Sequence, residues 1–563
     1  MATEKTFEIQ AADLPLELMY RWERERPRDV YLSQPVGGGV IRDYTFADTL
    51  SEARRMAAHL AALQLPRGSK IAILTKNCAH FFLSDLAIWM AGHVSVALYP
   101  TFAADTIRYI LDHSESRLLF VGKLDTWEQQ KGAVPAGMPC IAYPLAPKTE
   151  LPTWDEIVGR TAPIAGDPVR DGADTAALLY TSGSTGQAKG VEHTFHSMTA
   201  ATKSLGSIVT VGPTDRAMSY LPLAHAFERT AVEFQSFRSG MRIFFAESLD
   251  TFVADLRRAR PTVFHSVPRL WLKFQLGVHE KMPEKKLRTL LKIPIVAGVV
   301  KRKILTGLGL DQARFAVTGS APVPPELVQW YRDLGLELLE GYAMTEDFCC
   351  SHVSVPGAAR VGYVGTPAPG VEARISDEGE VLVKSPGHMK GYYKDPALTA
   401  ASYTPDGFFK TGDRGEYDDA GRLRITGRVK ELFKSSKGKY IAPAPIENLL
   451  NADAHVELSC VTGAGLARPI AILQLAEALR AQLRGAAERG PVEAALALLL
   501  ARVNERVEEW ERLECLVVSA DEWQIENGFL TPTMKLKRAA IEDRYGPHLE
   551  RWAASGAKVI WPG

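Results

Sequence analysis

The feature that most constrains this sequence is a glycine-rich loop that follows a short apolar segment. Residues 176–180 (AALLY) are apolar, and residues 181–190 contain three glycines, four Ser or Thr hydroxyls and a single lysine, Lys189. Glycine lets backbone N–H groups turn toward an anion without steric cost, and a lysine adds a point charge for phosphate. The loop is neither a Walker A sequence, because glycine follows Lys189, nor a GxGxxG motif. The pattern predicts a buried strand that ends in a phosphate-binding loop.

The segments on either side of this loop alternate between short β-branched runs and helical patterns. Strand, helix and strand at this spacing indicate βαβ units and a parallel sheet. The expected strands are 71–74, 94–98, 118–121, 242–245, 262–264 and 315–317. A helix is expected from His80 onward. The uncharged run 86–104 contains Gly92 and Pro100, which favours a buried helix–turn–strand over a membrane-spanning helix.

The pattern changes twice in the second half of the chain. From about residue 358, Gly and Pro recur and short alternating strands such as 379–383 appear, which is typical of an antiparallel β unit. Beyond about residue 427 a new αβ pattern begins, with a helix expected to open at Gly490-Pro491. The apolar stripe of that helix is predicted to be core and consists of Val492, Leu496, Leu499, Val503, Val507 and Trp510.

These changes define the expected architecture of the 563-residue chain, which is too long for one compact core. The fold class is α/β: a large N-terminal domain of doubly wound αβ subdomains plus a β unit, with a small mobile α+β C-terminal domain. The expected boundaries are 1–427 for the large domain, 428–431 for a hinge and 432–563 for the small domain.

Charge and cysteine content exclude several classes of function. The chain carries 66 basic and 66 acidic side chains, so bulk electrostatics give no argument for nucleic-acid binding. The six cysteines form no CxxC motif, and His193 and His196 have no third ligand at a suitable spacing, which argues against zinc. The N-terminus lacks an apolar leader, so a cytoplasmic protein with reduced thiols is expected.

Residues 180–190 resemble the phosphate-binding signature of the adenylate-forming enzymes. This superfamily includes acyl-CoA synthetases, nonribosomal-peptide adenylation domains and luciferases. The resemblance implies that the loop binds the phosphates of ATP, with Lys189 at the terminal ones. The implied loop residues are Thr181, Ser182, Gly183, Ser184, Thr185, Gly186 and Lys189.

A second segment, Gly341-Tyr342-Ala343-Met344-Thr345-Glu346, resembles the GYGxTE segment of the same superfamily. The resemblance makes Tyr342 a wall of the adenine pocket, Thr345 an α-phosphate contact and Glu346 a magnesium ligand. Magnesium usually takes one or two protein carboxylates together with phosphates, which suits a single glutamate. Ala343 stands where the family usually has glycine. The segment Gly319-Ser320-Ala321-Pro322 resembles the one that borders the adenine.

Two further motifs lie near the expected hinge. A carboxylate can accept two hydrogen bonds, and the resemblance assigns Asp413 and Arg428 to the ribose of ATP. Lys430 aligns with the residue about which the C-terminal domain turns. The stretch 434–443 is either a solvated basic loop or, by resemblance, a mobile loop that enters the active site or the CoA tunnel, with Lys434 and Gly438 on the CoA side.

The last two motifs bear on the acid substrate. Residues 530–538 (LTPTMKLKR) resemble the catalytic-lysine segment in its long-chain variant, and Lys535 matches by spacing, with Lys537 and Arg538 as flanking charges. Residues 219–229 resemble the segment beside the acyl carboxylate, which places His225 there. The candidate catalytic residues are Lys189, His225, Thr345, Glu346 and Lys535.

The resemblance implies an AMP-forming acid–thiol ligase that uses ATP and Mg²⁺ and passes a medium- or long-chain fatty acid to CoA. Transfer to a carrier-protein thiol and an aryl-acid substrate stay open, whereas a non-enzymatic nucleotide-binding scaffold is disfavoured because every charged position is present. Family members are often homodimers. Residues 281–303 carry eight basic residues and one acidic residue, and form either a peripheral contact with the inner face of a membrane or a solvated helix pair.

Overall fold

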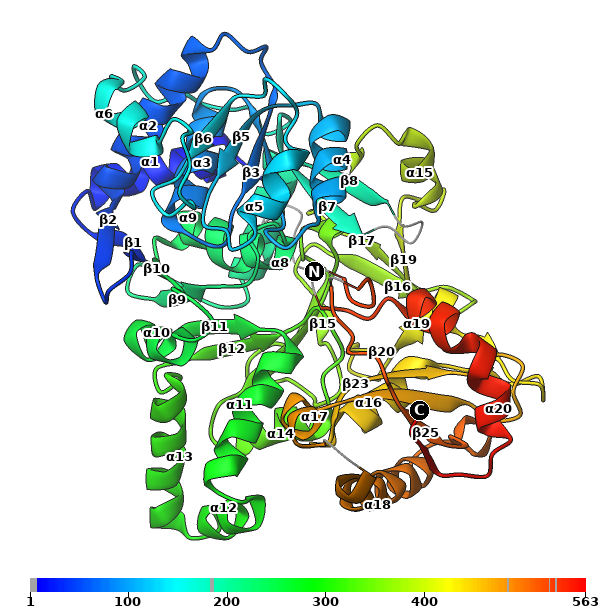
Figure 1. The fold of residues 1–563 in the computed structure, drawn as a ribbon. Helices are drawn as coiled ribbons and strands as arrows, with labels where there is room; N and C mark the ends of the chain where they lie inside the picture. Colours follow the sequence, from blue (N-terminus) through cyan, green and yellow to red (C-terminus); the bar gives the residue numbers. More distant parts are fainter. Residues whose placement is uncertain (1–7, 183–186, 484–485, 526, 532–533, 563) are drawn as a thin grey trace.

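The computed structural model describes residues 8–182, 187–483, 486–525, 527–531 and 534–562. Its largest sheet has seven strands in the order β18-β8-β7-β4-β3-β5-β6. This sheet lies in the upper part of Figure 1, where β3, β5, β6, β7 and β8 are labelled. Neighbours from β7 to β6 run parallel, and β8 and β18 add antiparallel strands at one edge. The strands are β3 (Lys70–Leu74), β4 (Val94–Leu98), β5 (Ser116–Val121), β6 (Cys140–Ala142), β7 (Thr175–Ser182), β8 (Ala188–Thr194) and β18 (Gly391–Tyr392). The predicted parallel sheet is confirmed.

The helices of the first 206 residues enclose this sheet. All twelve residues of α3 (Ala79–Met90) are buried, and the Trp89 indole donates to the Ala176 carbonyl of β7 at 3.0 Å. The run 86–104 is therefore the end of α3 followed by β4, as predicted. In the part of the chain that the structure describes, no helix has the length and apolar content to cross a bilayer. The other helices are α1 (Pro15–Glu25), α2 (Phe46–Ala62), α4 (Ala104–Ser114), α5 (Trp127–Gln130), α6 (Trp154–Arg160) and α7 (Phe195–Gly206).

Two smaller sheets complete the αβ part of the large lobe. One has the order β2-β1-β10-β9 and the other β11-β12-β13-β14-β15. Their strands are β1 (Val30–Pro35), β2 (Ile41–Thr45), β9 (Arg216–Ser219), β10 (Arg242–Phe245), β11 (Val263–Ser266), β12 (Phe315–Thr318), β13 (Leu338–Tyr342), β14 (His352–Val353) and β15 (Thr366–Pro367). The helices are α8 (Ala226–Glu228), α9 (Gln235–Ser239), α10 (Phe252–Ala259), α11 (Pro268–Lys281), α12 (Glu284–Leu291), α13 (Pro294–Leu308) and α14 (Pro325–Asp333). The strands expected at 242–245, 262–264 and 315–317 are present.

An antiparallel sheet follows, as the Gly- and Pro-rich sequence predicts. Its order is β16-β17-β19-β20, and a short helix, α15 (Pro396–Ala401), precedes β19. The strands are β16 (Glu372–Ile375), β17 (Glu380–Lys384), β19 (Phe409–Tyr417) and β20 (Leu423–Arg428). The last strand ends at Arg428, where the sequence pattern changes.

The segment beyond β20 builds a small lobe with its own core (Figure 1). Two clusters of buried apolar side chains lie wholly within residues 433–561. They pack around the sheet β23-β24-β25-β26 and beside the hairpin β21-β22. The strands are β21 (Phe433–Lys434), β22 (Tyr440–Ile441), β23 (Val456–Thr462), β24 (Ile470–Leu475), β25 (Leu516–Val518) and β26 (Val559–Ile560). The helices are α16 (Pro443–Asn451), α17 (Glu477–Gln482), α18 (Ala486–Asn504), α19 (Arg538–Tyr545) and α20 (Leu549–Ala553).

The helix expected to open at Gly490-Pro491 needs a correction. Helix α18 spans Ala486–Asn504 and contains Pro491 in its interior. Its core stripe from Val492 to Val503 is buried as predicted, but Val507 and Trp510 lie beyond the helix, and Trp510 is 37% exposed. The Lys439 ammonium stacks on the Trp510 ring at 5.1 Å, so an aromatic residue at helical spacing here serves a loop contact.

Candidate active site

The two segments predicted to border the adenine leave one sheet at the same edge. Strands β12 and β13 are parallel neighbours, and residues 319–322 follow β12 while residues 343–346 follow β13. A Cβ on Gly319 would lie 3.1 Å from the carbonyl oxygen of Gly341, so this approach favours glycine. Ser320 has a left-handed φ of 69°, which is uncommon outside glycine, and Ala321 and Pro322 are exposed. Carboxyl ends of parallel strands are the usual place for a ligand in such sheets.

Tyr342, Asp413 and Arg428 form one connected group. The Tyr342 hydroxyl donates to Asp413 Oδ2 at 2.8 Å, and Arg428 Nε lies 3.0 Å from Asp413 Oδ1. Asp413 and Arg428 are cross-strand partners in β19 and β20, which explains why residues fifteen positions apart meet. Burial raises the pKa of Tyr342 well above its usual value, so its hydroxyl stays a donor. The structure therefore brings the predicted adenine and ribose residues together.

Glu346 is held by two hydrogen bonds from residues 389–392, a segment far away in sequence. The Tyr392 hydroxyl donates to Glu346 Oε1 at 2.7 Å, and the backbone N–H of Met389 donates to the Glu346 carbonyl at 2.7 Å. The Lys189 ammonium lies 5.3 Å from the centre of the Tyr392 ring. Lys189 and Glu346, the predicted phosphate and metal residues, thus share a neighbour. Sequence reasoning missed Tyr392, whose only local signal is an aromatic residue in a Gly-Tyr-Tyr run.

The residues present fit a magnesium ion that is bound mainly through phosphate. Within the described ranges no group of three or more His, Cys, Asp or Glu side chains is arranged to hold a metal by itself. Glu346 offers one carboxylate at the strand edge, and Mg²⁺ commonly takes one or two carboxylates plus substrate phosphates.

The predicted phosphate loop comes between β7 and β8, which pair antiparallel. Thr181 pairs with Lys189 and Ser182 pairs with Ala188 at the end of β7. The remaining predicted loop residues lie outside the described residues; they are Gly183, Ser184, Thr185 and Gly186.

Asp347 is a second residue that sequence reasoning missed. It is fully buried, and its carboxylate accepts the Met344 N–H at 3.1 Å, which caps the turn Thr345–Asp347. Burial raises the pKa of Asp347 to about 8. The next two residues, Phe348 and Cys349, have φ of 47° and 61°, a left-handed conformation that non-glycine residues rarely adopt. A tight and strained turn therefore presents Glu346.

Lys535 enters this cluster from the small lobe. A narrow turn carries it: the Thr531 N–H donates to the Lys535 carbonyl at 2.8 Å, and the Lys535 N–H donates to Thr531 Oγ1 at 3.0 Å. The side chain is accessible to water although protein surrounds it, as expected for a group that projects into a cleft. This enclosure, and next the charge of Arg428, lower the pKa of Lys535, while Asp413 and Glu346 oppose the shift.

The other two basic residues of the 530–538 segment face elsewhere. Arg538 donates to Glu447 Oε1 at 2.7 Å and to the Val461 carbonyl at 2.8 Å inside the small lobe. Lys537 is exposed. Of the three candidates that the sequence offers, Lys535 is the one near Asp413 and Glu346.

His225 lies near Lys535 at the start of helix α8. Its Nδ1 accepts the Phe227 N–H at 3.0 Å, which places the imidazole proton on Nε2. Burial, followed by the charge of Lys535, lowers the pKa of His225 to about 3, so the ring is neutral. Glu228, one turn later, is fully buried and accepts from Ser219 at 2.8 Å and faces His265 Nε2 at 2.7 Å. The sequence pattern gave no signal that Glu228 would make these buried contacts.

The residues predicted on the hinge and CoA side lie apart from the cluster. Lys430 is exposed in the short helical turn Val429–Glu431. The Lys434 carbonyl accepts the Gly465 N–H at 2.9 Å, and a Cβ on Gly438 would lie 3.8 Å from Lys434 Cε. Lys434 and Gly438 therefore belong to the β21–β22 hairpin of the small lobe, which is packed on that lobe.

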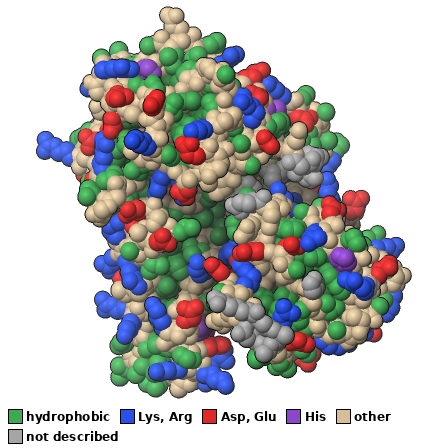
Figure 2. Space-filling model, in the orientation of Figure 1, with side chains coloured by type: hydrophobic (Ala, Val, Ile, Leu, Met, Phe, Trp, Pro, Cys, Tyr) green, Lys and Arg blue, Asp and Glu red, His purple; other side chains and the backbone are tan. Residues whose placement is uncertain are grey.

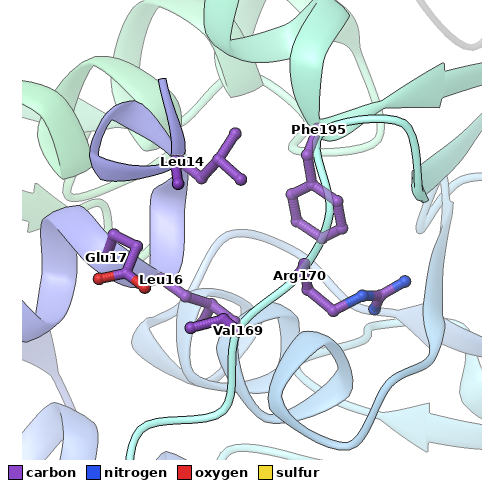
Figure 3. A pocket seen from close by; sticks show the side chains of 7 residues that line it. Leu14, Leu16, Glu17, Val169, Arg170 and Phe195 are labelled. Atoms are coloured by element: carbon purple, nitrogen blue, oxygen red, sulfur yellow. The ribbon is translucent and has the colours of Figure 1, made fainter. Parts of the chain in front are cut away.

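Two pockets lined by described residues lie apart from this cluster. One, of about 110 Å³, lies between Leu14 and Leu16 of the N-terminal segment and Val169 and Phe195 (Figure 3). Another, of about 290 Å³, lies where β3, β4 and β7 begin, opposite to the strand ends that carry the site. The candidate site lies between the two lobes, where Lys535 comes near Asp413 and Glu346. Figure 2 shows a hollow lined by hydrophobic side chains next to the segment that carries α11.

Comparisons with known proteins agree with this geometry. The family model described as AMP-binding enzyme matches residues 19–393. The long-chain-fatty-acid–CoA ligase FadD15 of Mycobacterium bovis is 28% identical over 97% of this chain and 98% of its own length. Fatty acyl-CoA synthetase A of Dictyostelium discoideum is 29% identical over 88% and 83%. The adenylation domain of a carboxylate reductase from Mycobacterium chelonae has a TM-score of 0.82 at 20% identity, covering 98% of this chain and 92% of that one.

Proposed function

Because the chain belongs to the AMP-binding enzyme family, we propose that it is an ATP-dependent ligase that activates a medium- or long-chain fatty acid as acyl-AMP and passes it to CoA. The observation that carries the proposal is that Lys535 of the small lobe lies close enough to Asp413 and Glu346 of the large lobe, and to Arg428 at its end, for their charges to shift its pKa. A nucleotide scaffold would not need a lysine from a second lobe at this point.

The first half-reaction joins two anions. A carboxylate oxygen of the acid attacks the α-phosphorus of ATP, the new O–P bond forms, and the bond to pyrophosphate breaks. Lys189 would hold the terminal phosphates and Lys535 the junction of carboxylate and α-phosphate, which offsets the repulsion. Thr345 would contact the α-phosphate, and neutral His225 would line the acid side.

Glu346 would hold Mg²⁺ together with the phosphates of ATP, with Tyr392 fixing one oxygen of its carboxylate. When bound, the ion would neutralise phosphate charge as pyrophosphate leaves.

The second half-reaction needs a thiol to reach the mixed anhydride. Lys535 stands in the cleft, so one orientation cannot both hold it there and admit the thiol. We place the pivot at Lys430, where the exposed turn Val429–Glu431 follows the last strand of the large lobe, with the large domain at 1–427, the hinge at 428–431 and the small domain at 432–563. After rotation, Lys434 and Gly438 would face CoA.

A pyrophosphate-release screen over straight-chain acids of graded length and over aryl acids, with and without CoA, tests the proposal. We expect release that depends on a medium- or long-chain acid and thioester formation with free CoA. Release without thioester until a carrier protein is added would favour carrier loading, and preference for an aryl acid would overturn the substrate class. Absence of acid-dependent release would overturn the enzyme proposal.

We also propose that the protein is cytoplasmic and touches an anionic membrane through residues 281–303. Helices α11 to α13 form a projection at the end of the molecule opposite to the seven-stranded sheet, and lysines and arginines border it (Figures 1 and 2). Helix α13 buries only Ala297 among its fifteen residues, while Ile295 is 87% and Val299 is 65% exposed. Basic side chains around exposed apolar ones are typical of an interfacial contact.

Vesicle sedimentation with and without phosphatidylserine tests this contact. We expect binding that requires the anionic lipid, falls with salt and weakens in Ile295→Asn. The matched control is Leu249→Asn, because Leu249 is 92% exposed but lies in the loop before α10. Binding that ignores salt, or that the two variants weaken equally, would contradict the proposal.

A further inference from the structure

The strand that carries Lys189 also carries a buried histidine, and we infer that His193 is a positioning residue that sets the distance between Lys189 and Glu346. The inference rests on the proposed function, in which these two residues hold the triphosphate and its metal ion. His193 has no exposed surface, and it is not one of the family motif residues quoted above.

Strand geometry puts His193 on the same face of β8 as Lys189. Side chains alternate along a strand, so Lys189, Val191 and His193 point to one face. Tyr392 of β18 is the antiparallel cross-strand partner of Val191 and therefore shares that face. The face thus presents a cation at one end and an imidazole at the other, with a tyrosine between them.

Three hydrogen bonds join the turn that presents Glu346 to β8 and to residues 389–392. His193 Nε2 lies 2.7 Å from the Thr345 carbonyl oxygen, the Tyr392 hydroxyl donates to the Glu346 carboxylate, and Met389 donates to the Glu346 carbonyl. A carbonyl only accepts, so Nε2 carries the proton and Nδ1 faces Ser197 Oγ at 3.2 Å. Of the three bonds, the one from His193 alone originates on the strand of Lys189.

The surroundings of His193 make this bond persistent. The ring packs edge-on against Phe348 with centroids 5.3 Å apart. Burial lowers the pKa of His193 to about 4, so the imidazole is neutral near neutral pH and keeps one donor and one acceptor. The turn it holds is the one with left-handed φ at Phe348 and Cys349, a conformation that needs support from its surroundings.

Loss of the His193 donor would let this turn move relative to Lys189. The consequence falls mainly on the half of the site that handles magnesium and the β- and γ-phosphates. Acyl transfer from preformed acyl-AMP to CoA uses neither and keeps only the Thr345 contact to the α-phosphate, so it would change much less. A purely structural role would impair both half-reactions together.

The experiment compares His193→Leu, His193→Gln and a matched control, His196→Leu. His196 lies three residues away and is exposed. Glutamine keeps an N–H donor of similar reach. Calorimetric titration with MgATP and no acid reports binding without turnover. We expect His193→Leu to weaken MgATP binding roughly tenfold, the effect of leaving a buried carbonyl without its donor. His193→Gln should recover most of the affinity, and His196→Leu should match the parent protein.

The half-reactions then separate positioning from general damage. Pyrophosphate release should fall roughly ten- to a hundredfold in His193→Leu, as for a small misplacement of reacting groups, while acyl transfer from preformed acyl-AMP stays within about twofold. Equal loss in both halves, unchanged MgATP affinity, or failure of glutamine to rescue would overturn the inference. If the parent protein binds MgATP but forms no acyl-AMP, the proposed function fails, and the binding comparison still decides the role of His193.

Discussion

Two lysines are proposed to act at the candidate site, and the structure holds them in opposite ways. Lys189 lies on β8, inside a seven-stranded sheet with neighbours on both sides. Lys535 lies on a narrow turn of the small lobe and reaches the cleft from outside the large lobe. Lys189 is therefore fixed within the large lobe, whereas the small lobe contributes Lys535. A two-step reaction that needs Lys535 only in its first step is suited to this division.

The ion pairs also differ, because those of Arg229 in the large lobe are buried, whereas a pair between the lobes is exposed. In the large lobe, Arg229 contacts Asp85 and donates to Glu233 Oε2 at 2.9 Å, and all three side chains have no exposed surface. Between the lobes, Arg506 and Glu326 pair at 3.0 Å with more than half of each side chain exposed. Exposed pairs contribute little stability, whereas a buried charge that loses its partner is costly.

The largest expected effect comes from Arg229→Met, which removes the cation from the buried triad. Asp85 and Glu233 would face each other without it, and burial already raises the pKa of both carboxyls. We expect the large lobe to lose about 3–5 kcal/mol of stability. Chemical denaturation measures the change, and Arg302→Met on the exposed part of α13 is the control. A loss no greater than in the control would mean that the large lobe is not held as rigidly as argued.

The next effect concerns Lys535, the lysine that the small lobe contributes. Lys535→Ala should slow adenylation roughly a hundredfold or more, since a preorganised donor at the reacting groups contributes about 3–4 kcal/mol. Acyl transfer from preformed acyl-AMP to CoA should change little. Lys537→Ala, an exposed neighbour on the same segment, is the control. Equal losses in both half-reactions would contradict the proposed difference between Lys189, which is fixed in the large lobe, and Lys535, which the small lobe contributes.

The sequence predicted the separate parts of both regions better than it predicted their contacts. Strand positions such as β4 and β10 follow from local apolar runs, and the signature segments resemble a known family. The pairing of β18 with β8 joins residues about two hundred positions apart, so the bond from Tyr392 to Glu346 has no local signal. Helix α18 passes through Pro491 because its apolar face packs into the core of the small lobe, which overrides a local helix-start signal.

A smaller effect appears in the pH dependence of adenylation. Enclosure in the cleft, and next Arg428, lower the pKa of Lys535 below that of a free lysine. The cation is present below that pKa and is lost as pH rises through it, so adenylation should decline at lower pH than a free lysine predicts. Arg428→Gln removes the neighbouring positive charge and should shift the decline to higher pH, measured at saturating ATP. A decline of adenylation at an unchanged or lower pH would show that Arg428 does not lower the pKa of Lys535.

The smallest effect tests the contact between the lobes. Arg506→Gln breaks the exposed pair with Glu326, and we expect the free energy of unfolding to change by less than about 1 kcal/mol. If the small lobe swivels, this pair opens during each cycle, and its loss leaves the folded lobes intact while favouring orientations without Lys535 in the cleft. Adenylation should then slow modestly and acyl transfer should be unchanged or faster, whereas slowing of both would mean that the pair supports one fixed arrangement. In the denaturation assay, Arg229→Met should lower the free energy of unfolding strongly, whereas Arg506→Gln should hardly change it. This difference distinguishes a movable contact from a structural one.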